Sequence, residues 1–151
     1  MITINEFKSK VSDGSRIIGI DLGSKRIGIA ISDGNRKIAT PYKTLEKIKS
    51  SKLIEDIKNI IKENDIKGII VGNPINMDGS YGKSSQSAKD RAINLADKFN
   101  IPVCLWDERL STVGAFNISS ELDIKVSKRV KDIDKFAAAF ILQGALDYLQ
   151  N

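Results

Sequence analysis

Two short apolar segments joined by a glycine-containing turn constrain the fold more than any other feature of the chain. Ile17–Leu22 and Ile27–Ile31 are rich in isoleucine, and Gly23 begins the turn between them. β-Branched residues favour strands, and glycine adopts the backbone angles of a tight turn. Residues Arg16–Asp33 are therefore predicted to form a β-hairpin. Its first strand carries a carboxylate, Asp21, among its apolar side chains.

The rest of the chain alternates between helical and strand patterns. Apolar residues at helical spacing occur in four segments, 50–64, 84–99, 111–119 and 134–149. Short apolar runs typical of strands occur at 68–72 and 102–106, and a further strand is predicted at 36–44. Ser84 is expected to cap its helix, and residues 120–132 are expected to form a charged, mobile loop. With 151 residues, the chain is predicted to be a single α/β domain in which helices pack on the faces of one mixed sheet.

Histidine is absent from the chain, and this excludes several kinds of catalytic site. Ser-His-Asp and Cys-His mechanisms, HExxH zinc sites and a histidine general base are impossible, so any chemistry must come from carboxylates, lysines, hydroxyls or bound metal. The one cysteine, Cys104, lies in an apolar run and is predicted to be a small buried strand residue. No apolar run approaches the ~20 residues that cross a bilayer, and Met1–Gly14 lacks the apolar stretch of a signal peptide. We therefore expect a cytoplasmic protein with no membrane partner.

Basic residues exceed acidic ones, which gives a net charge of +5 and a pI near 9.3. Two groups of basic residues lie beside acidic candidates: Lys25 with Arg26 in the hairpin turn, and a C-terminal group of Lys125, Lys128, Arg129, Lys131 and Lys135. Either group alone is compatible with an ordinary solvated surface. Their position next to carboxylates favours a nucleic-acid partner.

Asp21 is the most informative acidic residue. Alternate residues of a strand share a face, so Asp21 is expected to lie with Ile17 and Gly19. A carboxylate in such an apolar strand is costly unless a cation or hydrogen bonds compensate its charge. Asp21 is therefore interpreted as a metal ligand, with a turn hydrogen bond to Ser24 as the structural alternative.

Further acidic candidates follow the last predicted strand and begin the last predicted helix. Asp107 and Glu108 come directly after residues 102–106, at the end of a strand where α/β sheets bind ligands. Arg109, which follows them, is equally suited to a structural ion pair with one of these acids. Asp134 precedes a helical pattern of small apolar residues and would project inward from the start of that helix. An N-cap role would explain Asp134 without catalysis.

Asp21, Glu108 and Asp134 together predict a site for divalent metal. Hard cations such as Mg²⁺ bind several oxygen ligands, and phosphoryl-transfer sites commonly hold two ions about 4 Å apart. Carboxylates from the first strand, the last strand and the last helix reach such ions only if these elements meet at one edge of the sheet. The three acids are therefore the predicted catalytic and metal-binding residues, with two Mg²⁺ or Mn²⁺ ions as the expected cofactors and Asp107 as a substitute ligand.

Two phosphate-binding motifs are only partly matched. Gly82-Lys83-Ser84 resembles the end of a P-loop, but that motif requires glycine at a position where this chain has Met77. The loop 73–84 is still suited to phosphate, because glycines and a helix N-terminus favour anions. Ile20–Gly23 resembles the phosphate loop of sugar kinases, actin and heat-shock chaperones. Those proteins enclose ATP between two such domains, and the sequence has no second Asp-x-Gly loop of this kind.

These residues together resemble the YqgF (RuvX-like) family, small relatives of the Holliday-junction resolvases. The resemblance spans about Arg16 to Leu149, and its Asp-Glu-Arg-Leu block is specific. The matching stretches are Gly19–Ser24 with Arg26–Ala30, Val71–Pro74 with Asn76–Gly79, Pro102-Val103, Asp107–Thr112, and Asp134 ahead of Ala137-Ala138 and Ile141–Gln143.

The resemblance implies a ribonuclease-H-like fold in residues 16–151, with 1–15 as an N-terminal extension. Its five-stranded mixed sheet would have three antiparallel strands followed by two parallel ones. The implied activity is that of a metal-dependent nuclease that matures the 5′ end of pre-16S rRNA, with Asp21, Glu108 and Asp134 in the acidic roles. The residues expected to contact nucleic acid are Lys25, Arg26, Lys83, Arg109, Lys128 and Arg129.

One departure from the resolvase pattern concerns the second metal. The strand that ends at Gly72 has no acid where resolvase-type relatives usually carry one. Glu108 would then substitute for it from the neighbouring strand.

Two other functions remain open at the level of sequence. A junction-resolving DNA endonuclease would use the same ligands, but it would need a symmetric dimer that cuts two strands. A non-catalytic RNA-binding factor in ribosome assembly would bind RNA without the acids or metal. The sequence is compatible with RNA or DNA, because contacts to bases and 2′-hydroxyls depend on surface shape.

Overall fold

The computed structural model describes residues 1–12, 14–23, 26–46, 50–73, 82–107 and 126–150, and of these it gives only the backbone for residues 50, 83–85 and 126–132. The five strands in this part of the chain are β1 (Arg16–Leu22), β2 (Arg26–Ser32), β3 (Ala39–Glu46), β4 (Ile66–Asn73) and β5 (Val103–Asp107). They form one sheet in the order β3-β2-β1-β4-β5. β2 is antiparallel to both of its neighbours, β1 and β3, whereas β4 runs parallel to β1 and β5 runs parallel to β4. This is the mixed sheet predicted from the sequence, and the predicted hairpin is its first two strands.

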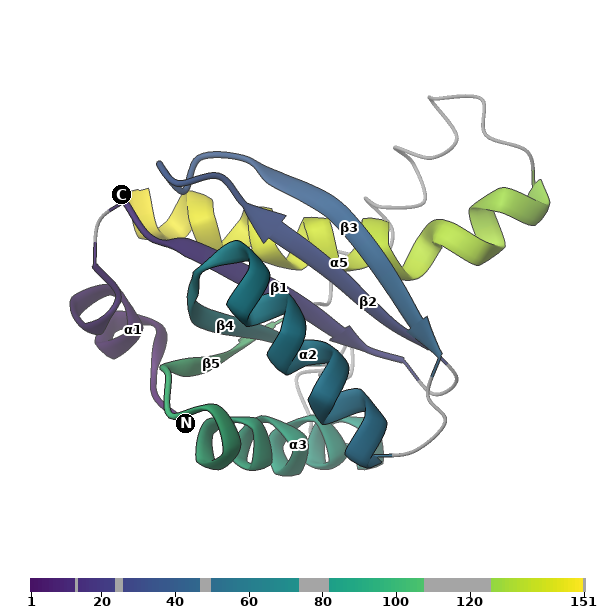
Figure 1. Cartoon of the computed structure of the whole chain (residues 1–151), viewed down its shortest axis with the longest axis horizontal. Helices are drawn as coiled ribbons and strands as arrows, with labels where there is room; N and C mark the ends of the chain where they lie inside the picture. The colour runs from purple at the N-terminus through teal and green to yellow at the C-terminus, as the bar shows by residue number, and fades with distance from the viewer. Residues whose placement is uncertain (13, 24–25, 47–49, 74–81, 108–125, 151) are drawn as a thin grey trace.

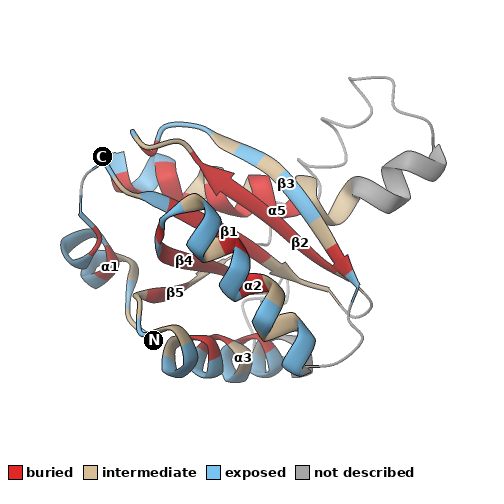
Figure 2. Cartoon of the chain, viewed as in Figure 1, coloured by how far each residue is buried: buried red, intermediate tan, exposed pale blue. Residues whose placement is uncertain are grey.

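Helices cover both faces of the sheet (Figure 1). α2 (Ser50–Asn64) and α3 (Lys83–Phe99) lie on one face, and α1 (Ile4–Lys10) and α5 (Val126–Gln150) lie on the other. Strand alternation creates two separate cores. Ile18 and Ile20 of β1 pack under α2 and α3, whereas Ile17 packs under α5. Figure 2 shows buried residues along the central strands and along the sides of the helices that face them.

α5 approaches the sheet closely because glycines stand where it crosses. A Cβ at Gly19 of β1 would lie 2.7 Å from Cβ of Leu142, and a Cβ at Gly28 of β2 would overlap the carbonyl oxygen of Asp134. On the helix side, Ala138 and Ala145 are fully buried. Small residues on both surfaces therefore let the helix backbone rest almost directly on the strands.

α1 brings the start of the chain into the core under α5. Thr3 caps this helix, and Thr3 and Glu6 form a capping box. Phe7 is fully buried against Gly68 of β4, and the backbone N–H of Ile2 donates to the carbonyl of Val103 at 3.0 Å. The segment predicted as an extension therefore contributes apolar contacts to the same core as α5, and its separation from the domain at residue 15 stays a prediction.

Cys104 is buried in β5, as the sequence predicts. Burial disfavours its thiolate and raises the pKa of the thiol to about 11. No helix in the described part of the chain is long and apolar enough to span a bilayer.

Several element boundaries differ from the prediction. The predicted cap at Ser84 is wrong, since α3 begins one residue earlier, and Gly82 occupies the N-cap without a side-chain hydrogen bond. β3 lies at Ala39–Glu46 instead of 36–44, and β4 extends beyond 68–72 at both ends. The predicted helix at 111–119 lies outside the described residues.

The largest difference is the start of the last helix. α5 begins at Val126, so residues 126–132, predicted to be loop, are helical and Asp134 lies two turns inside the helix. Nothing in residues 126–133 breaks a helix, because the segment lacks glycine and proline. An N-cap role for Asp134 is therefore ruled out.

Gly28→Ala is expected to lower the free energy of unfolding by at least about 2 kcal/mol, because its Cβ would force α5 off the sheet. Gly34→Ala is the matched control, since its Cβ would lie 3.6 Å from the nearest atom, an ordinary contact. Urea denaturation of both variants measures the difference. Equal stability of the two variants would contradict the close crossing.

Candidate functional site

Asp21 lies near the end of β1 on the face covered by α5. It pairs in register with Gly28 of β2, and directly paired residues of antiparallel strands point to the same face. Gly19, two residues earlier, is overlain by α5, and Ile17 belongs to the α5 core. The predicted face is therefore confirmed. Asp21 itself is half-buried.

Asp134 is brought to Asp21 by the crossing of α5 over β2. The carbonyl of Asp134 lies against Gly28, the residue that pairs with Asp21. The Oδ1 atom of Asp134 is 3.5 Å from the place where a Cβ of Gly23 would stand, at the end of the first strand. Two acids remote in sequence thus meet on one face of the sheet, beyond the carboxyl end of β1.

Arg26 is bound to Asp134. Its Nε donates to Oδ2 of Asp134 at 2.8 Å, and the two side chains are 31% and 17% exposed. The hydrogen bond and charge of Asp134 raise the pKa of Arg26 above its usual range. Arg26 was predicted to contact nucleic acid. In the structure it fixes one oxygen of Asp134 and so orients the carboxylate.

Asp107 lies at the same edge of the sheet but on the other face. It ends β5 and pairs with Asn73 of β4. Trp106 packs on the α5 side and Leu105 on the side of α2 and α3, so alternation places Asp107 on the side of Leu105. As a substitute metal ligand Asp107 is therefore poorly placed relative to Asp21.

The remaining predicted site residues lie partly or wholly outside the described residues. Glu108, Arg109 and Lys25 are among those not described. Lys83 begins α3, close after the carboxyl end of β4, and its side chain is not described. The same holds for two residues in the first turns of α5, Lys128 and Arg129.

The donor chemistry of the site suits a hard divalent cation. Asp21 and Asp134 supply carboxylate oxygens, which Mg²⁺ and Mn²⁺ prefer. Among the described residues, no group of three or more carboxylate or thiol side chains lies close enough together to hold a metal ion. The two acids are therefore a partial ligand set to which Glu108, the third expected ligand, would add.

Sequence reasoning missed the glycines that assemble the site. Gly28 was treated only as part of a strand, and Gly23 only as part of a turn. The signal was present, because small residues interrupt the isoleucine strands at Gly19, Gly28 and Ala30, all on one face. Such a stripe predicts a closely packed helix on that face.

A family model described as "RuvX: Holliday junction resolvase" matches residues 15–148. A protein of Pelagibacter ubique named "Putative pre-16S rRNA nuclease" is 62% identical over 151 residues, which is 100% of both chains. A protein of Chelativorans sp. with the same name is 43% identical over 150 residues, covering 99% of this chain and 94% of the relative.

A solved structure with a similar fold is that of RuvC from Thermus thermophilus in complex with a Holliday junction substrate. The TM-score is 0.55 with 13% identity, covering 91% of this chain and 96% of the other. At this identity the likeness shows the fold, which is the ribonuclease-H-like fold expected from the sequence.

A double-mutant cycle on Arg26→Met and Asp134→Asn is expected to give a favourable coupling energy, because each side chain is partly buried and the hydrogen bond is short. Lys67 and Asp65 form the control pair, which is close at 3.0 Å but 54% and 84% exposed. That pair should show no measurable coupling, since water screens it. Equal coupling in the two cycles would mean that Arg26 does not hold Asp134 in solution.

Proposed function

The chain belongs to the RuvX family, and from this premise we propose that it is a metal-dependent nuclease acting on the 5′ end of the precursor of 16S ribosomal RNA. As a member of this family it hydrolyses phosphodiester bonds. The choice of this precursor RNA as substrate rests on the names of relatives that match nearly the whole chain. The cytoplasm, where ribosomal RNA is made in bacteria, is the proposed place of action.

One observation carries the proposal more than any other. Asp21 and Asp134 come from opposite ends of the sequence and lie side by side on one face, at the carboxyl end of a central strand. Parallel and mixed α/β sheets bind ligands at this edge. Two carboxylates placed at this edge suit a site for cations and phosphate.

The proposed roles follow from these positions. Asp21 is the central ligand, because it extends from the rigid middle of the sheet. Asp134 is an outer ligand through Oδ1, since its Oδ2 accepts from Arg26. Glu108 is the other outer ligand. It directly follows Asp107, and if the alternation of β5 continued by one residue it would return to the side of Asp21.

A bound divalent cation would supply charge stabilisation for the phosphate and a more acidic water. The chain's own residues would hold the cation and orient its ligands. The sheet fixes Asp21, and Arg26 fixes Asp134. Substrate phosphates would be held by Lys25, Lys83, Arg109, Lys128 and Arg129.

Asp21→Asn is expected to leave the fold intact and reduce magnesium-dependent cleavage of precursor 16S RNA at least ~100-fold, because it removes the central carboxylate. Asp97→Asn, which neutralises an exposed acid on α3, is the control and should cleave at the rate of the unchanged protein. Cleavage is measured on synthetic precursor RNA and on a four-way DNA junction, with and without Mg²⁺.

The outcomes separate the candidate functions. Magnesium-dependent cleavage of the RNA by the unchanged protein and its loss in Asp21→Asn support the proposal. Cleavage of the junction alone, by a protein that sediments as a dimer, would favour the DNA endonuclease. RNA binding without cleavage in the presence of any metal would favour the non-catalytic RNA-binding factor. Unchanged cleavage by Asp21→Asn would show that Asp21 has no role in the mechanism.

Glu108→Gln and Asp107→Asn form a matched pair that tests the third ligand. Each removes one negative charge, and the two positions are adjacent in sequence. We expect Glu108→Gln to lower the cleavage rate at least ~100-fold and Asp107→Asn to lower it less than ~10-fold, because Asp107 lies on the other face of β5. The reverse order would assign the ligand to Asp107.

A further inference from the structure

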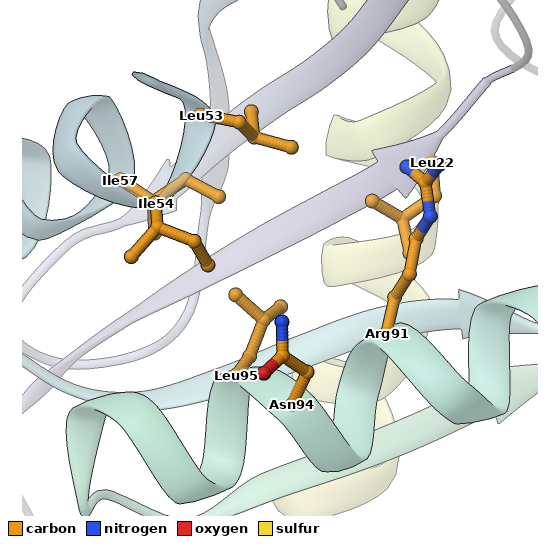
Figure 3. A pocket seen from close by; sticks show the side chains of 7 residues that line it. All are labelled: Leu22, Leu53, Ile54, Ile57, Arg91, Asn94 and Leu95. Carbon is orange, nitrogen blue, oxygen red and sulfur yellow. The ribbon is translucent and has the colours of Figure 1, made fainter. Parts of the chain in front are cut away.

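A small cavity opens between α2, α3 and the end of β1, on the face of the sheet opposite to Asp21 and Asp134. Figure 3 shows its lining, which is apolar from β1 and α2 and partly polar from α3. Its polar border is formed by Arg91 and Asn94, and its apolar part by Leu22, Leu53, Ile54, Ile57 and Leu95. Its volume is about 50 Å³, more than the ~30 Å³ of one water but well short of a nucleobase.

Arg91 reaches from the middle of α3 toward the catalytic edge of the sheet. α3 runs from the carboxyl end of β4 back to the amino end of β5, so its N-terminus lies at that edge. Helical side chains tilt toward the helix N-terminus. Figure 3 accordingly shows the guanidinium of Arg91 beside Leu22, the last residue of β1.

The side chain of Arg91 borders a mostly apolar cavity. The side chain is half-buried, with its stem over the cavity. None of the hydrogen bonds or ion pairs among the described residues involves its guanidinium. A planar donor group placed over an apolar surface without an anionic partner is suited to an incoming phosphate.

This cation lies close to the candidate catalytic pair. Leu22 directly follows Asp21 in β1, and alternation sends their side chains to opposite faces. Only the edge of one strand therefore separates the Asp21 side from the Arg91 side. A strand of nucleic acid crossing this edge would meet the carboxylates on one side and Arg91 on the other.

We propose that Arg91 and the adjoining apolar wall form a subsite for one nucleotide of the substrate strand, beside the scissile position. Arg91 binds the phosphate of this nucleotide. The nucleoside lies over the mouth of the cavity, against Leu53 and Ile54, because the cavity is too small to enclose a base. The exposed amide of Asn94 offers a donor and an acceptor at the rim.

The subsite rests on the proposed nuclease function, so binding is measured separately from cleavage. All variants are made in the full chain carrying Asp21→Asn, and the probe is fluorescent precursor 16S RNA. Affinity is measured over a range of KCl concentrations, because the slope of log K against log salt counts the phosphates that are neutralised. Cleavage by the same variants with Asp21 restored gives kcat and KM.

Lys98→Ala is the matched control for Arg91→Ala. Lys98 is an exposed cation seven residues further along α3, which places it on nearly the same helical face and about 10 Å nearer the amino end of the sheet. Both variants remove one positive charge from the protein. They differ in distance from the catalytic edge.

Arg91→Ala is expected to weaken RNA binding roughly five- to tenfold at moderate salt and to reduce the salt slope by about 0.7–0.9, the share of one phosphate. KM should rise accordingly, with kcat changed less than ~2-fold. Arg91→Lys should restore the slope and part of the affinity, since it keeps the charge. Leu53→Ser should weaken binding with an unchanged slope, because it removes an apolar contact and no charge.

Two results would overturn the subsite. The first is a salt slope of Arg91→Ala equal to that of Lys98→Ala. This result counts against the subsite if the protein with Arg91 and Lys98 unchanged binds RNA and, with Asp21 present, cleaves it. The second is a fall in thermal stability for Arg91→Ala with unchanged affinity, since Arg91 would then be only a packing residue. Failure of the parent protein to bind or cleave any RNA would instead refute the proposed function itself.

Discussion

The contact between the backbone of α5 and Gly28 is the constraint on which the site depends. Any side chain at position 28 would occupy the space of the Asp134 carbonyl, so the helix could not come down onto β2. Asp134 reaches the neighbourhood of Asp21 only because this space is empty. Packing and function are therefore linked through one missing methyl group. Beyond this contact, α5 also packs against β1 and β3.

The ion pair between Arg26 and Asp134 shows how the site tolerates its own charge. Two carboxylates on one face of the sheet repel each other, and apolar surroundings solvate a carboxylate poorly. Arg26, on the strand next to β1, donates to one of them, Asp134, at 2.8 Å. The ion pair therefore stabilises the folded state whether or not a cation binds beside it.

Strand patterns predicted the fold well, because an isoleucine-rich strand leaves little choice of face. The position of Asp21 on the side of Ile17 follows from alternation alone. The starts of helices were harder to predict than the strands. The many charged residues in 126–132 suggested a loop, although no residue there opposes a helix. α1 was missed because seven residues are too few to establish a helical period, and the burial of Phe7 depends on a distant glycine. Arg91 was missed for a similar reason: its sequence neighbours give no sign of the strand end beside it.

The two members of the Arg26–Asp134 pair are separated by 108 residues of sequence. Contacts of such long sequence separation form late, because the loop between the partners must close first. During synthesis, β1 and β2 leave the ribosome long before α5 exists. A growing chain can therefore order most of its sheet while its acids stay apart. The two acids therefore come together only in a nearly finished polypeptide.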